Sequence, residues 1–475
     1  VGKNVNVNSY LHVRNGRLNC KGDFYANYYS EIYMQNEKDI LNVEGTFTFS
    51  NLRYSCDFSN GTLIIGGNCN VNGGDFRATA AHKTIFNGEQ KQIINVTNTY
   101  ASFGKIIFNN TSEDGIEVKN SFNYAELVNE SGCKVIFANG GTVGETLSAD
   151  KVVDGDYILA MGELDLNGHT LTINGDFIQA GGEVKINSGK LVVNGNYRIQ
   201  TKKATEDGKE SYDYSTGILN MTNESDVVEV SGDFVMGSTK SHDGKLSAGT
   251  LTVGGNFTQL SYNARNNFVA SGSHKVIFTS EKNHAISFDS SRSGESHFAN
   301  LTFEDDSKIT LKNDSYKRVT VTGSLTGTGC EISGYIDLAG AAKVVNKYKG
   351  NIRISEGYTL NSDISISGNF SAESYLYLNG KQLSTDGNVT ISSYIGIQSG
   401  TLNCKGNLVV NYYSGRINMD NSSGVIDVEG NFVFNCGDYT SYLTKGKLYI
   451  AGDCTINYST FNSNTDNEII FDGTE

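Results

Sequence analysis

Apolar and polar residues alternate along most of the chain. In the stretch Leu191-Val-Val-Asn-Gly-Asn-Tyr-Arg-Ile199, apolar side chains occupy alternate positions, and Gly195 shares their parity. A period of two predicts a β-strand with one buried face. The side chains that we expect to point inward, here and in a second such segment, are Leu191, Val193, Tyr197, Ile199, Val228, Val230 and Phe234.

A glycine recurs at the same place in these segments. Leu, Ile or Val usually stands four residues before it, and Asn, Asp or Thr follows it. A glycine inside a strand pattern indicates a bulge or a tight corner, and Gly-Asn or Gly-Asp pairs tolerate positive φ. The pattern therefore predicts structural coil corners at Gly22, Gly45, Gly67, Gly175, Gly195, Gly232, Gly255, Gly368, Gly387, Gly406, Gly430 and Gly452.

Most successive marker glycines stand 19 to 24 residues apart. A period near 22 residues is too short for a propeller blade and suits one coil of a β-solenoid. The leucine-rich consensus, the calcium-binding nonapeptide and a strict hexapeptide period are absent. We predict an all-β fold, a right-handed parallel β-helix of about 20 coils stacked about 4.8 Å apart. The right hand follows from the general preference of parallel crossovers.

A longer repeat lies above the short one. Asn15-Gly-Arg-Leu-Asn-Cys-Lys-Gly-Asp-Phe24 returns as Ser399-Gly-Thr-Leu-Asn-Cys-Lys-Gly-Asn-Leu408. We expect one continuous solenoid over residues 1–475, with long repeats at about 2–174, 175–386 and 387–475, the last of them partial. Neither end shows an obvious cap, which solenoids usually need. The end coils are therefore expected to stack on further repeats or on other copies.

Composition narrows the classes of partner. The chain carries a formal net charge of −14 and lacks a cluster of Lys and Arg, which disfavours binding to nucleic acid. No apolar run approaches the roughly 20 residues of a membrane span. The absence of proline suits a chain of paired strands. Cysteines on the inward parity are expected to be buried free thiols, with disulfides between coils as the alternative: Cys20, Cys69, Cys404 and Cys454.

No side chains form a recognisable catalytic or metal motif. His82 and His274 each precede a Lys-x-Ile-Phe strand, and this repetition favours a structural role. The strongest acidic candidates are Asp154, Asp156, Glu163 and Asp165, which one coil could present on a shared face, as in polysaccharide lyases and glycosidases. The corresponding positions of the next long repeat hold Ser367, Asn369, Tyr375 and Tyr377, which favours a solvated role for the acids.

Three polar features remain. Asn residues at corners are expected to form hydrogen-bonded ladders along the solenoid. The pairs Tyr28-Tyr29 and Tyr412-Tyr413 are expected to pack, with sugar binding as the alternative. The segment from Thr201 to Ser215 lengthens one coil and is expected to be a solvated loop, although insertions in repeat proteins often lie on a binding face.

The strands Leu171-Thr-Ile-Asn-Gly-Asp-Phe177 and Ile426-Asp-Val-Glu-Gly-Asn-Phe432 resemble those of large bacterial cell-surface proteins with β-helical, adhesin-like repeats. The resemblance implies an extracellular rod or fibre segment, structural or adhesive, whose ligand is a glycan or a host surface. We expect no catalysis, no catalytic residue, no cofactor and no metal site. The alternatives are a carbohydrate-active lyase or hydrolase on the same scaffold, and a filament protomer that stacks end to end.

Overall fold

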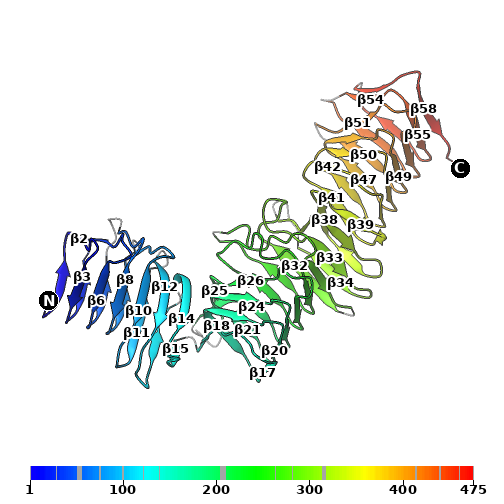
Figure 1. The fold of residues 1–475 in the computed structure, drawn as a ribbon. Helices are drawn as coiled ribbons and strands as arrows, with labels where there is room; N and C mark the ends of the chain where they lie inside the picture. Colours follow the sequence, from blue (N-terminus) through cyan, green and yellow to red (C-terminus); the bar gives the residue numbers. More distant parts are fainter. Residues whose placement is uncertain are drawn as a thin grey trace.

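Residues far apart in the sequence stack as parallel strands in the computed structural model of the chain (Figure 1). The structure describes residues 2–27, 29–50, 56–73, 76–98, 101–120, 122–138, 140–203, 210–262, 264–280, 282–312, 317–411, 414–437, 440–458 and 460–473. The fold is an all-β parallel solenoid of about 20 turns. Its two termini lie at opposite ends of a bent rod (Figure 1).

Each coil contributes a strand before the corner that a marker glycine occupies in many coils, a strand after that corner and, in many coils, a third strand. The strands form pre-glycine, post-glycine and third sheets, in three successive sections. In the first section, the pre-glycine sheet runs from β3 (Arg17–Cys20) to β14 (Asn123–Asn129), the post-glycine sheet from β1 (Val5–Val7) to β15 (Val135–Phe137), and the third sheet pairs β2 (Tyr10–His12) with β5 (Glu31–Tyr33).

New sheets begin in the second section. The pre-glycine sheet runs from β17 (Lys151–Val153) to β39 (Lys343–Val345), the post-glycine sheet from β16 (Thr142–Val143) to β37 (Glu331–Ser333), and the third sheet contains β19 (Glu163–Asp165), β22 (Glu183–Lys185) and β26 (Ile218–Asn220). Each sheet is therefore interrupted between the first and second sections, where Figure 1 shows a step in the rod.

The third section continues to the C-terminus. Its pre-glycine sheet runs from β40 (Lys347–Tyr348) to β58 (Asn467–Phe471), its post-glycine sheet from β35 (Thr320–Val321) to β56 (Cys454–Ile456), and its third sheet from β42 (Tyr358–Thr359) to β57 (Phe461–Ser463). Two hydrophobic clusters fill the rod: one spans the first section and reaches Met161, and the other runs from Leu147 to Ile450. The division into long sequence repeats stays a prediction.

The predicted inward residues are confirmed. All seven, from Leu191 to Phe234, are at most 2% exposed. Tyr197 is fully buried, and its hydroxyl donates a hydrogen bond of 2.7 Å to Gln179 Oε1. A buried phenol needs such a partner, because an unsatisfied polar group in the core is costly. The alternation of the sequence thus places aromatic and aliphatic side chains in one continuous core.

The marker glycines lie at bends between the pre- and post-glycine strands. Their expected reason was wrong, because none of them has a positive φ. A Cβ atom on Gly195 would instead lie 2.6 Å from the carbonyl oxygen of Gly175 in the preceding coil. The Gly195 N–H donates to that same oxygen at 3.0 Å. Close approach of stacked backbones therefore selects glycine here.

The residue after each glycine completes the corner. Asp176 Oδ1 accepts the backbone N–H of Asn196 at 2.7 Å, and Asn196 Oδ1 accepts the N–H of Asp233 at 2.8 Å. The same contact recurs in the third section, where Asn388 Oδ1 accepts the N–H of Asn407 at 2.8 Å. The predicted ladder is thus present, and its repeating bond joins a side chain to the next backbone N–H.

Candidate functional site

The acidic candidates do not share a site. Asp154 and Asp156 lie at the corner between β17 and β18 (Tyr157–Met161), whereas Glu163 and Asp165 belong to β19 on the other side of β18. A five-residue strand separates the two pairs by roughly 16 Å. Asp156 Oδ1 accepts the N–H of Asp176 at 2.8 Å, and Glu163 forms an ion pair of 2.6 Å with Lys185. These acids serve the corner ladder and surface ion pairs.

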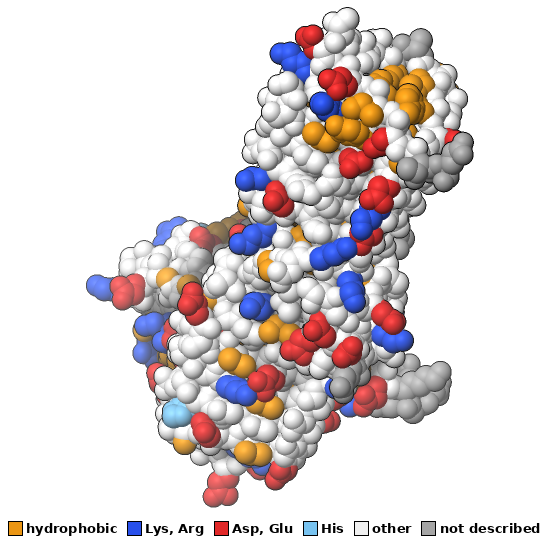
Figure 2. Space-filling model, turned by 90° about the vertical axis from the view of Figure 1, so that its right-hand side faces the viewer, with side chains coloured by type: hydrophobic (Ala, Val, Ile, Leu, Met, Phe, Trp, Pro, Cys, Tyr) orange, Lys and Arg blue, Asp and Glu red, His pale blue; other side chains and the backbone are white. Residues whose placement is uncertain are grey.

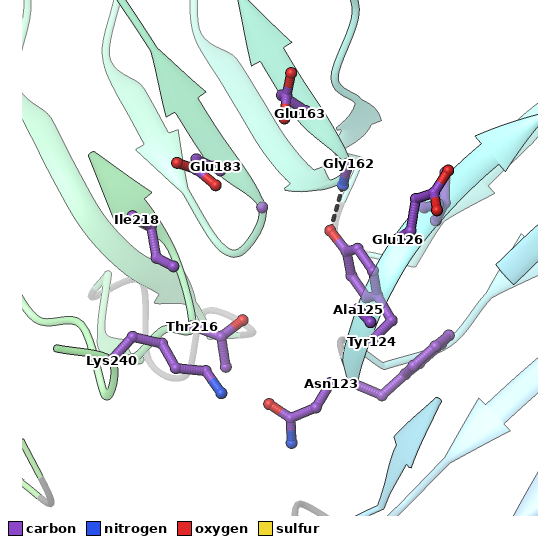
Figure 3. A pocket seen from close by; sticks show the side chains of 13 residues that line it. Asn123, Tyr124, Ala125, Glu126, Gly162, Glu163, Glu183, Thr216, Ile218 and Lys240 are labelled. Atoms are coloured by element: carbon purple, nitrogen blue, oxygen red, sulfur yellow. Dashed lines mark hydrogen bonds between the residues drawn. The ribbon is translucent and has the colours of Figure 1, made fainter. Parts of the chain in front are cut away.

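The structure instead assembles a cleft at the step between the first two sections (Figure 3). Its volume is about 440 Å³. One wall is β14, from which Tyr124 and Glu126 line the space, and the other contains Glu163, Glu183 and Lys240. Three carboxylates from separate coils therefore border one space.

Ion pairs occupy the carboxylates of the cleft. Glu126 contacts Lys105 at 2.7 Å, and Glu183 contacts Lys245 at 2.9 Å. Burial works to raise the pKa of Glu183, but hydrogen bonds from Lys245 and Asn220 outweigh it and lower that pKa overall. Glu183 is therefore charged at neutral pH and is not poised as a general acid.

Tyr124 fixes the geometry of the cleft. Its hydroxyl accepts the backbone N–H of Gly162, which joins the last pre-glycine strand of the first section to the second section (Figure 3). Burial raises the pKa of Tyr124 to about 12. The phenol therefore stays neutral and holds the two walls together.

Five histidines are buried in the solenoid: His82, His242, His274, His284 and His297. His82 Nδ1 lies 2.8 Å from the carbonyl oxygen of Asn60, and His242 Nε2 accepts the N–H of Leu219 at 3.0 Å. Both ring nitrogens of His274 are buried without a hydrogen-bond partner among the described residues. Burial lowers the pKa of His82, His242 and His274 to about 4. These rings are neutral parts of the core.

Acid should therefore weaken the fold before the carboxylates titrate. A histidine whose folded pKa is depressed stabilises the protein fully above its unfolded pKa, and this stability is lost as the pH falls from about 6.5 towards 4. We expect the denaturation midpoint to fall over this range. His274→Leu should make the denaturation midpoint less dependent on pH without lowering it at pH 7.5. The control His169→Gln, at a partly exposed side chain, should leave the pH dependence of the midpoint unchanged. An identical pH profile for wild type and His274→Leu would contradict this assignment.

The cysteines follow the prediction with one exception. Cys20, Cys69 and Cys404 are buried and free. Cys454 is also free but exposed, which corrects the expected burial. It lies in β56, which is the terminal strand of its sheet among the described residues and pairs there with β53 (Phe432–Asn435) alone. Strand parity alone does not indicate which strand is the terminal one of a sheet.

The insertion after Thr201 contributes an antiparallel strand pair. Gln200 pairs with Tyr214 and Lys202 with Tyr212, the one antiparallel pairing among the described strands. The Arg198 guanidinium lies 4.8 Å from the centre of the Tyr212 ring. Residues 204–209 lie outside the described residues. At least the base of the insertion is therefore a structured extension of β24 (Tyr197–Lys202), where a solvated loop was expected.

A second candidate surface is rich in tyrosine. Tyr28, Tyr412 and Tyr413 lie outside the described residues, and Tyr29 is 56% exposed. A group that the sequence did not single out as a site lies on the outer face of the third section. We call this group the tyrosine face, and its members are Tyr375, Tyr377, Tyr394, Arg416 and Tyr442.

The tyrosine face is built by strand register. Tyr394 pairs with Arg416 in the next coil, and the Arg416 guanidinium lies 4.9 Å from the centre of the Tyr394 ring. The ring of Tyr377 lies 5.3 Å from that of Tyr394. A Cβ atom on Gly396 would lie 2.9 Å from the Tyr377 ring, so glycine leaves room for this packing. The result is a half-exposed aromatic surface beside a cation.

The described residues contain no group of three or more His, Cys, Asp or Glu side chains that could hold a metal ion. Within the same ranges, no helix is long and apolar enough to cross a membrane. Comparison of the chain with protein-family models, with curated proteins and with solved structures gave no match. The fold and its surfaces therefore carry the functional argument.

Proposed function

We propose that the chain is a segment of an extracellular structural and adhesive rod, of the kind found in bacterial surface proteins. The observation that carries the proposal is the corner ladder, which repeats in all three sections as an Asp or Asn oxygen bonded to the next coil. A scaffold built from one repeated contact supplies length and stiffness and has no natural upper limit. We propose no catalysis, because the acidic candidates support the ladder and the surface.

The adhesive role is assigned to the tyrosine face. Aromatic rings with a polar edge and a nearby guanidinium are frequent in binding surfaces, because they offer large contact area at low entropic cost. Tyr375 is 50% exposed and Tyr442 is 53% exposed, so both rings are open to a ligand. The face suits the ring of a saccharide, with Arg416 beside it as a hydrogen-bond donor. This places ligand binding on the side of the rod.

A glycan array tests this role. The chain should bind a subset of saccharides, and Tyr375→Ala combined with Tyr394→Ala should lower that binding about tenfold or more, since each aromatic contact contributes roughly 0.5–1.5 kcal/mol. The matched control is Tyr262→Ala, at a tyrosine that is 68% exposed elsewhere. Equal loss in the control would refute the assignment. Release of oligosaccharides from the array would favour the lyase or hydrolase alternative.

A second candidate function is end-to-end assembly. The last coil exposes apolar side chains: Ile456 is 44% exposed and Phe471 is 66% exposed. Figure 2 shows hydrophobic side chains gathered at the upper end of the rod, where the C-terminal coil lies. Among the described residues, the strands β56, β57 and β58 each pair with another strand on one side only. Such an edge can accept a matching edge, and a head-to-tail contact that does not close gives an open filament.

Light scattering on the 475-residue chain tests this assembly. The average mass should rise with concentration, and Phe471→Glu should suppress the rise because it places a charge on the apolar end. Tyr262→Glu, at an equally exposed position away from the ends, should leave it unchanged. A chain that stays monomeric at high concentration would remove the basis for this function.

A further inference from the structure

The last pre-glycine strand of the first section ends in an open edge. β14 pairs with β12 (Ser102–Phe108) at every residue except Ala125, with Ile106 opposite Leu127. On its other side no strand pairs with it among the described residues, and the corresponding sheet of the second section starts afresh at β17. With seven residues, β14 is as long as any strand in the described chain. A long open edge inside the rod is unusual, because edges favour unwanted pairing.

The directions of the backbone N–H and C=O groups along this edge follow from the hydrogen bonds of β12. The N–H groups of Lys105 and Asn109 donate to the coil before β12. In a parallel ladder the backbone N–H and C=O groups of alternate residues point to opposite neighbouring strands, so those of Ile106 and Phe108 point towards β14. Continuing the alternation along the pairs from Lys105–Glu126 onward, Glu126 and Val128 face β12, whereas Leu127 directs its N–H and C=O groups away from it. That side is the cleft described above, which residues Phe122 to Leu127 line.

The cleft has the dimensions of a strand site. The five consecutive β14 residues that line it, Asn123 to Leu127, span roughly 16 Å, the length of an ordinary short strand. The contact between Tyr124 and Gly162 holds the opposite wall in place (Figure 3). Gly162 and Gly182 on that wall carry no side chains, so the space beside the edge stays unfilled. An extended backbone is the ligand that matches alternating N–H and C=O groups at this spacing.

The charges specify the side chains of the occupant. The lining includes Glu126, Glu163 and Glu183 and one lysine, Lys240. In the existing ladder, Lys105 lies opposite Glu126 and forms an ion pair of 2.7 Å with it. A further strand would bring its own side chain to the other side of Glu126. A cation there continues the existing pattern, whereas a carboxylate would meet like charges.

We propose that β14 binds an extended polypeptide segment carrying a lysine or arginine, which adds to the sheet as a further strand and places its cation beside Glu126, Glu163 and Glu183. The site lies inside the rod, so it is independent of the two end coils and of the tyrosine face. It gives the rod a means to hold a partner protein by backbone pairing at the step between its sections.

The probe is a fluorescently labelled peptide with the sequence of residues 273–280, Ser-His-Lys-Val-Ile-Phe-Thr-Ser, taken from a strand of this same sheet type. Fluorescence anisotropy should show saturable binding to the full chain. Methylation of alternate amide nitrogens of the peptide should weaken binding about tenfold, because it removes backbone donors. Replacing its lysine by glutamate should weaken binding to a similar degree.

Variants of the protein locate the site. Leu127→Pro removes an N–H directed at the cleft, on an edge where proline is tolerated, and should lower the affinity about tenfold. Leu127→Ala retains the N–H and should bind like wild type, and thermal melting verifies that both variants fold. Equal binding by the methylated peptide, or undiminished binding by a folded Leu127→Pro variant, would overturn the proposal, as would the absence of saturable binding by wild type. If Leu127→Pro fails to fold, the methylated peptide decides.

Discussion

Replacing Gly195 with alanine should lower the free energy of unfolding by roughly 2–5 kcal/mol, more than most single substitutions cost. The added Cβ would lie 2.4 Å from Asp176 Oδ1 and 2.6 Å from the carbonyl oxygen of Gly175. Both neighbours belong to the corner ladder and cannot move away without breaking hydrogen bonds. The cost combines overpacking with the loss of the charge-assisted bond from Asn196 N–H to Asp176.

The measurement is the midpoint of chemical denaturation. Gly357→Ala is the matched control, because a Cβ atom there meets nothing within 4 Å and φ lies outside the left-handed region. The control should stay within about 0.5 kcal/mol of wild type. The double variant Asp176→Ala with Gly195→Ala should cost less than the sum of the two single changes, because the first removes one of the clashing atoms. A Gly195→Ala variant as stable as wild type would show that the corner relaxes freely.

The strands of each coil and their inward residues could be predicted from the sequence. Period-two alternation identified the inward residues, such as Tyr197 and Phe234, because each strand carries its own pattern. The marker spacing identified the solenoid, because many coils repeat the same corner. The backbone conformation of the marker glycines could not be predicted from the sequence, since it depends on contacts with the preceding coil. The φ of Gly195 is ordinary, and what excludes a side chain is the backbone of Gly175.

The interruptions of the sheets left a signal that is clear in retrospect. No marker glycine occurs between Gly67 and Gly175, and the sheets of the first section end within that interval. None occurs between Gly255 and Gly368, where the second set of sheets gives way to the third. The two long intervals without a marker glycine thus contain the places where one set of sheets ends and the next begins.

The candidate surfaces were much harder to predict. The cleft joins Tyr124 to Gly162, Glu183 and Lys240, which lie in separate coils, and no local motif connects them. Its existence depends on the step in the rod. The tyrosine face depends on register, which places Tyr394 beside Arg416 of the next coil. A repeat pattern predicts what all coils share, whereas a binding surface consists of the positions in which they differ.

A position in which the coils differ also holds the most deeply buried ion pair of the described residues, at the passage from the second to the third section. Asp337 is 1% exposed, and the Arg353 guanidinium donates two hydrogen bonds to its carboxylate, from Nη2 at 2.7 Å and from Nε at 3.0 Å. Arg318 lies 3.7 Å from the same carboxylate. Glu373 lies near both guanidinium groups, at 3.7 Å and 3.9 Å. Asp337 thus anchors a network of two cations and two anions.

Replacing Asp337 with asparagine should lower the free energy of unfolding by roughly 3–5 kcal/mol, because it leaves a buried guanidinium without its counter-charge. Asp386→Asn is the control: its carboxylate pairs with Lys347 and Lys405 near the surface, where an ion pair contributes about 1 kcal/mol or less. The double variant Asp337→Leu with Arg353→Met should recover much of the loss, since removing both charges avoids the unpaired ion. Chemical denaturation measures all three. If Asp337→Asn costs no more than Asp386→Asn, the pair is not buried in solution, and the passage between the two sections is more open than its strand register implies.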